Sequence, residues 1–119
     1  MNEYSEWFNK ALKDLDTAKY NINGKRLDAG AFFLQQSAEK ALKATILKKS
    51  KELIKTHDLV ALAKKANASQ DIIDKCKKLS PAYGYTRYPD IPKPEELDDK
   101  INELLSIAED IIKWVKKNL

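Results

Sequence analysis

The sequence predicts an all-α protein, an antiparallel up-and-down four-helix bundle with an additional short helix. Apolar residues recur at intervals of three and four along most of the chain, and no segment alternates as a strand does. Only three glycines and four prolines are available to interrupt helices. A chain of 119 residues is the usual size of one core, so residues 1–119 are expected to form a single domain.

The first helix is expected over residues 3–23, where eight apolar residues share one helical face. They are Tyr4, Trp7, Phe8, Ala11, Leu12, Leu15, Ala18 and Ile22. Gly24 should end this helix, because glycine enters the left-handed region without a side-chain clash.

A second helix is expected over residues 28–49, with Asp28 as its N-cap. Its core stripe consists of Ala31, Leu34, Ala38, Ala41, Leu42 and Thr45. The opposite side is polar and consists of Gln36, Glu39, Lys40 and Lys43, beside Phe32. This polar side is either a solvated surface, with Glu39 and Lys43 as a helix-stabilising pair, or a groove whose lysines reach an anionic ligand.

Two shorter helices should follow, over residues 59–66 after a cap at Thr56 or Asp58, and from residue 70 to either residue 79 or residue 83. Cys76 occupies a core position of the latter, as a small hydrophobe rather than a nucleophile. The last helix should start with Pro94 at or just before its first turn and acidic residues at its N-terminal end. Its excess apolar residues are expected to cover a second subunit. They are Ile107, Ile112 and Trp114.

Composition narrows the function classes. The net charge of +4 is spread over interspersed acidic and basic residues, which disfavours a dedicated DNA-binding domain. One cysteine and one histidine exclude an intramolecular disulfide and disfavour a metal site. No apolar run spans a bilayer and no signal peptide is present, so a cytoplasmic protein without membrane or cofactor is expected.

Residues 80–93 form the longest stretch without helical periodicity, and long irregular connections in compact domains are often functional. Within this stretch, residues 83–90 are predicted as the functional segment. Arg87 offers a planar fork for phosphate or carboxylate, and Tyr83 and Tyr88 could stack on a base. Alternatively, this is a proline-stiffened loop whose tyrosines cover the bundle end while Arg87 bonds Asp90 or helix carbonyls.

His57 is the sole histidine and lies in the turn Thr56-His57-Asp58-Leu59. It is either a histidine bonded near a helix start or a general base within reach of a substrate. The sequence has no phosphate-cradling glycine loop, paired-carboxylate motif or serine-nucleophile signature.

Three segments together resemble the HEPN domain (higher eukaryotes and prokaryotes nucleotide-binding), in the order and spacing of its small, mainly archaeal, single-domain members. They are the run from Phe33 to Ala44 containing Gln35-Gln36-Ser37-Ala38-Glu39-Lys40-Ala41-Leu42-Lys43, the turn from Thr56 to Leu59, and Tyr83 with Arg87-Tyr88-Pro89-Asp90. The resemblance implies a helical bundle, usually a homodimer, often encoded beside a minimal nucleotidyltransferase with which it acts as a toxin–antitoxin-like pair.

Many members are ribonucleases with an Arg-x(4–6)-His motif, which this chain lacks because no histidine follows Arg87. The resemblance therefore favours a non-catalytic or weakly catalytic protein that binds a nucleotide or RNA phosphate. The ligand-binding residues would be Gln36, Lys40, Lys43, His57, Tyr83, Arg87 and Tyr88. The alternatives are a ribonuclease that uses Arg87 with His57, and a purely structural dimerising adaptor.

Overall fold

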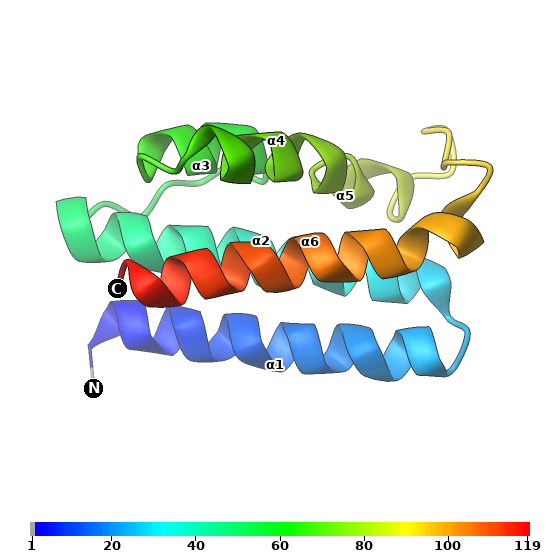
Figure 1. Cartoon of the computed structure of the whole chain (residues 1–119), viewed down its shortest axis with the longest axis horizontal. Coiled ribbons are helices and arrows are strands. Elements are labelled where there is room, and N and C mark those ends of the chain that lie inside the picture. The colour runs from blue at the N-terminus through cyan, green and yellow to red at the C-terminus, as the bar shows by residue number, and fades with distance from the viewer. Residues whose placement is uncertain (1) are drawn as a thin grey trace.

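The computed structural model describes residues 2–119, and every regular element among them is a helix. In chain order the elements are α1 (Glu3–Asn23), α2 (Leu27–Ser50), α3 (Leu59–Lys65), α4 (Gln70–Leu79), α5 (Ala82–Tyr85) and α6 (Leu97–Lys117). Figure 1 shows the long rods α1, α2 and α6 side by side, with α3, α4 and α5 along one side of them. The predicted all-α bundle is confirmed.

The four longest helices alternate in direction, because α1 and α4 run one way and α2 and α6 run the other (Figure 1). The central helix is α2, which packs against α1, α3, α5 and α6. Large side chains from four helices meet at the core with almost no exposed surface, each contributing about 1.5–3 kcal/mol of burial free energy. The largest are Leu34, Leu42, Leu59, Leu62, Leu79, Ile111 and Val115.

The turn between α1 and α2 differs from the prediction in one detail. Gly24 is the C-cap residue of α1, but its φ of −84° is not left-handed. The left-handed conformation falls one residue later, on Lys25 with φ 65°. The N-cap of α2 is Arg26, so the prediction of Asp28 as the cap was wrong. Asp28 lies in the first turn and instead forms an ion pair with Lys93 at 3.2 Å.

The two middle helices have side-chain caps that fix where they begin. Asp58 accepts a hydrogen bond from the backbone N–H of Val60 at 3.0 Å and so caps α3, as one of the two predicted alternatives proposed. Ser69 caps α4 in the same way. Of the two predicted ends of α4, Leu79 is confirmed and residue 83 was wrong, because the separate short helix α5 follows.

The last helix starts at Leu97, three residues after Pro94, and its N-cap residue is Glu96. Ile107 and Ile112 are 5% and 6% exposed, since the chain itself covers them. The prediction that these residues form excess apolar surface for a second subunit was therefore wrong. One ion pair joins α4 to α6, because Lys75 Nζ lies 3.1 Å from Asp110 Oδ2. The same Nζ lies 2.9 Å from Asp71 Oδ2 of its own helix.

No helix among residues 2–119 is both long and apolar enough to span a bilayer.

Candidate ligand-binding site

The centre of the candidate site is a buried carboxylate on α2. Glu39 is only 4% exposed, although an unpaired carboxylate inside a protein is costly. Spacing by four along the helix brings Gln35 and Lys43 onto the strip of α2 that carries Glu39. Gln35 Nε2 lies 3.2 Å from Glu39 Oε1, and Lys43 Nζ lies 3.0 Å from Glu39 Oε2. Gln36 Nε2 adds a longer contact to Oε1, at 3.4 Å.

His57 is a further partner of this carboxylate. Its Nδ1 lies 2.9 Å from Glu39 Oε1, and because the carboxylate oxygen accepts, Nδ1–H is the donor of this hydrogen bond. Gln35 Nε2 also donates to the carbonyl oxygen of His57 at 3.1 Å, so both the ring and the backbone are held. The side chain is 51% exposed, and its Nε2 has no hydrogen-bond partner within residues 2–119. Nε2 is therefore available to a ligand.

The position of His57 follows from the start of α3. Asp58, the next residue, is the N-cap, and the N–H of Leu59 donates to Ser80 Oγ at 3.0 Å. These bonds fix the chain at the start of α3. They therefore restrict where His57, two residues before Leu59, can lie. The structure thus agrees with the predicted histidine bonded near a helix start, while the role of general base stays a prediction.

Tyr83 on α5 stacks on the other functional side chains. Its ring lies parallel to the His57 imidazole, with the ring centroids 4.0 Å apart and the planes 12° from each other. The Arg87 guanidinium carbon lies 4.8 Å from the Tyr83 centroid, 5.6 Å from that of Tyr88 and 6.0 Å from that of Phe32. Cation–π contacts of this kind hold a guanidinium without neutralising its charge.

No carboxylate of residues 2–119 forms an ion pair with Arg87, and Asp90, its predicted alternative partner, forms none with it. Arg87 is exposed. An exposed guanidinium held against aromatic rings keeps its hydrogen-bond donors for phosphate or carboxylate.

The two lysines of the predicted site have different partners. Lys40 forms an ion pair with Asp14 of α1, so it is directed away from His57 and towards the first helix. Lys43 is 7% exposed, bonds Glu39 and lies 5.8 Å from the ring centroid of Trp7. The polar side of α2 is therefore not a simple solvated surface, because its central ion pair is buried.

Six of the seven predicted site residues are connected through Glu39 and Tyr83. They are Gln36, Lys43, His57, Tyr83, Arg87 and Tyr88. Lys40 is outside this set, which we call the Glu39–Tyr83 cluster. Glu39, Phe32 and Gln35 were not among the predicted ligand-binding residues, although Glu39 was predicted on the polar side of α2 with Phe32 beside it. Only the spacing by four from Gln35 to Glu39 and Lys43 indicated that these polar residues share one strip.

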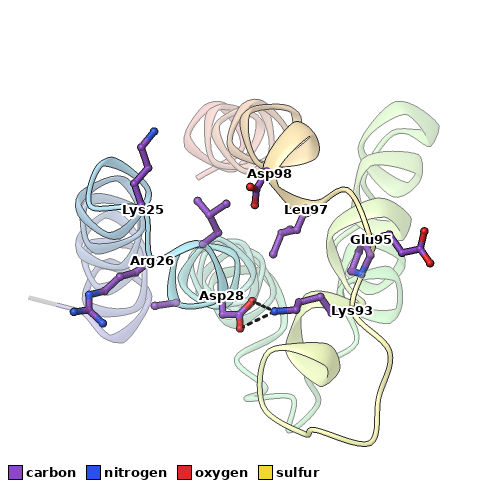
Figure 2. A pocket seen from close by; sticks show the side chains of 10 residues that line it. Lys25, Arg26, Asp28, Lys93, Glu95, Leu97 and Asp98 are labelled. Carbon is purple, nitrogen blue, oxygen red and sulfur yellow. Dashed lines mark hydrogen bonds and ion pairs between the residues drawn. The ribbon is translucent and has the colours of Figure 1, made fainter.

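The surface has hollows at the edge of this cluster and beyond it. One of about 390 Å³ is lined by Arg87 and Tyr88 together with Lys93. Another, of about 660 Å³, lies where α2 and α6 begin. Figure 2 shows that Asp28 and Lys93 point towards each other there, whereas Lys25 and Arg26 point away from that pair. Cationic side chains therefore do not converge in this second hollow.

The sequence and the fold of this chain are both similar to those of known proteins. The sequence matches the HEPN domain over residues 4–118, which is nearly the whole chain. This chain belongs to the HEPN domain family. The predicted resemblance is thereby confirmed.

Two solved structures are similar to this HEPN protein. TT1696 from Thermus thermophilus is 26% identical, with a TM-score of 0.87 and all of both chains covered at 100%. ST0689, an archaeal HEPN homologue, is 28% identical, with a TM-score of 0.79 and 98% of each chain covered. None of the curated proteins matches the sequence.

The HEPN fold brings together two residues that the sequence separates. Pro92, Lys93 and Pro94 occupy the positions where an Arg-x(4–6)-His motif starting at Arg87 would place its histidine. His57 instead precedes Arg87 in the chain, yet both side chains contact the ring of Tyr83.

Proposed function

We propose that this HEPN protein binds a nucleotide or an RNA phosphate at the Glu39–Tyr83 cluster. The observation that carries the proposal is the state of Arg87, which is exposed and held against the rings of Tyr83 and Tyr88, with no carboxylate partner among residues 2–119. A phosphate would accept the paired N–H donors of the guanidinium, and His57 Nε2 would face the same ligand. The exposed Tyr88 ring offers a surface on which a base can stack.

Titration with ATP, GTP and a short single-stranded RNA tests this proposal. Arg87→Ala should weaken binding about tenfold or more, because a charge-assisted hydrogen bond contributes about 1.5–3 kcal/mol. Arg26→Ala is the matched control, since Arg26 is the only other arginine of the sequence, is exposed, and lies in the turn between α1 and α2, outside the cluster. Absence of binding to all three ligands, or equal losses for both variants, would contradict the proposal.

We further infer that the protein acts with a minimal nucleotidyltransferase in a toxin–antitoxin-like module, as the family resemblance implies. The protein encoded by the adjacent gene is the partner to test, by co-expression and co-purification. A purely structural adaptor would hold this partner equally well after Arg87→Ala and would bind no nucleotide. Loss of the partner upon Arg87→Ala would instead place the partner surface at the cluster.

A second function is ribonuclease activity, and the Glu39–His57 hydrogen bond is what favours it. A carboxylate that fixes one ring nitrogen of a histidine and leaves the other free is an arrangement used in general acid–base catalysis. If this chain cleaves RNA, His57→Ala should abolish cleavage. Glu39→Gln should lower kcat with little change in KM, because Glu39 positions the imidazole without touching RNA. Absence of cleavage by the unmodified protein would reject this function.

A further inference from the structure

A third hollow, lined by both apolar and charged side chains, lies between α4, α5, the connection at residues 86–96 and α6. Its volume is about 720 Å³, within the range of about 300–1,000 Å³ typical of small-molecule sites. None of the residues of the Glu39–Tyr83 cluster lines it. Its apolar wall consists of Pro81, Tyr85, Pro92, Pro94 and Leu104.

The apolar wall is built from stiff groups. Three of its residues are prolines, whose φ is fixed by the ring and whose nitrogen carries no hydrogen to solvate. Leu104 is 7% exposed and is part of the core. Tyr85 is half-buried against that core, and burial raises the pKa of its hydroxyl, so this group stays neutral and can donate a hydrogen bond. A ring-shaped ligand would meet a preformed surface here.

The rim of the hollow carries an excess of positive charge. Lys78 lies 3.5 Å from Glu103, and Lys93 lies 3.2 Å from Asp28. Lys100 also lines the hollow, and no acidic side chain of residues 2–119 forms an ion pair with it. Two of the three lysines are therefore paired, and Lys100 has its charge free for a ligand.

The geometry points to a binding site for a small ring-bearing organic anion, such as an aromatic carboxylate or sulfonate. The ring would lie on Tyr85 and the prolines, and the anionic group would reach Lys100. This site is separate from the proposed phosphate site, since Arg87, His57 and Tyr83 do not line it. It would operate whether or not the cluster binds a nucleotide.

Anilinonaphthalene sulfonate is a suitable probe, because its fluorescence rises in apolar surroundings and it carries one negative charge. The full-length protein should bind it saturably. Amide chemical shifts should change at Tyr85, Lys93, Lys100 and Glu103 but not at Lys113, which lies further along α6. Naphthalene carboxylate should displace the probe, and the neutral naphthalene methanol should do so only weakly. Shifts confined to other parts of the chain would overturn the proposal.

Two substitutions that change the charge of the rim should have opposite effects on the affinity for the probe. Lys100→Glu should weaken probe binding about fivefold or more, and Glu103→Gln, which removes the acidic partner of Lys78, should strengthen it. Lys113→Glu is the matched control, since it makes the same charge change on an exposed position of the same helix.

ATP binding at the Glu39–Tyr83 cluster should not change in any of these variants, which separates failure of this site from failure of the phosphate site. Equal binding by Lys100→Glu and Lys113→Glu, or equal displacement by the charged and neutral naphthalenes, would overturn the assignment of an anion site.

Discussion

Glu39 illustrates how much a single side chain depends on its neighbours in this fold. Its carboxylate lies inside the bundle and is surrounded by donors from Gln35, Lys43 and His57. Two of these come from its own helix and are implied by spacing. The third comes from a segment that folds back over α2, eighteen residues later in the chain. The same residue would be a solvated surface glutamate if that segment lay elsewhere.

Thr45 is the counterexample, a buried polar group without a partner. Its Oγ1 has no hydrogen-bond partner within residues 2–119, and the residue is fully buried. Thr45→Val should therefore raise the free energy of unfolding by about 1 kcal/mol, because it removes an unpaired hydroxyl while keeping the shape of the side chain. Urea unfolding measures this, with Thr17→Val on the half-exposed side of α1 as the control. A loss of stability would show that the Thr45 hydroxyl has a partner after all.

The buried thiol of Cys76 makes the free energy of unfolding depend on pH. Burial, with a smaller contribution from Asp58, raises the pKa of its thiol from 9.0 to about 12. The stabilisation is complete below pH 9.0, where both states hold the proton, and is lost as the pH rises towards about 12. The unmodified protein should therefore lose more stability between about pH 8 and pH 10 than Cys76→Ala does, as measured by urea unfolding. Equal losses in the two proteins would contradict this.

At the scale of helices, small residues decide how closely α1 and α2 approach. A Cβ added at Gly30 would lie 2.6 Å from Ile22 Cγ1, which is closer than two carbon atoms can pack. The predicted stripe of α2 also holds Ala31, Ala38 and Ala41, and all three are fully buried. The helices α1 and α2 are the most extensively paired helices of the bundle.

Gly30→Ala should destabilise the protein by about 1–3 kcal/mol, because Ile22 or the α1 backbone must move. Gly24→Ala is the matched control. An added Cβ there would have its nearest neighbour at 3.5 Å, and φ is −84°, so that variant should be close to neutral. Thermal unfolding of the two variants tests the difference. An unchanged midpoint for Gly30→Ala would mean that the helices can separate without cost.

At the scale of the whole molecule, the chain buries its own core, and its exposed apolar residues are few. Among residues 2–119 the large ones are Leu12, Tyr20, Leu53, Tyr88 and Ile91. Two of these five lie in the connection between α5 and α6. Tyr88 belongs to the Glu39–Tyr83 cluster, and Ile91 lines the same hollow as Arg87. A homodimer, which the family resemblance predicts, would therefore be formed more readily through this connection than through the apolar face of α6.

Light scattering at micromolar concentration should give about twice the chain mass of 13.6 kDa. Tyr88→Asp should shift the mass towards the monomer, because a carboxylate replaces an exposed ring of the interface. Leu53→Asp is the control, since Leu53 is equally exposed but lies before α3. A monomeric mass for the unmodified protein would reject the dimer, and equal effects of the two variants would reject this interface.

The sequence by itself determined the fold class, the family and most helix limits. Helical periodicity, caps and the HEPN motifs are local properties that the folded chain retains. The sequence could not determine that α4 stops before α5, or that other parts of the same chain cover Ile107 and Ile112. Both depend on which surfaces meet in three dimensions.

For the candidate site, too, the sequence indicated some features and the tertiary structure decided the others. Residue type indicated Arg87, His57 and the tyrosines as ligand-binding groups, and spacing placed Glu39 beside Lys43 on α2. Only the tertiary structure decided that Lys40 pairs with Asp14 while His57 bonds Glu39 and stacks on Tyr83. Partners of this kind come from distant parts of the chain, and their distances are fixed by how the helices pack rather than by any local pattern.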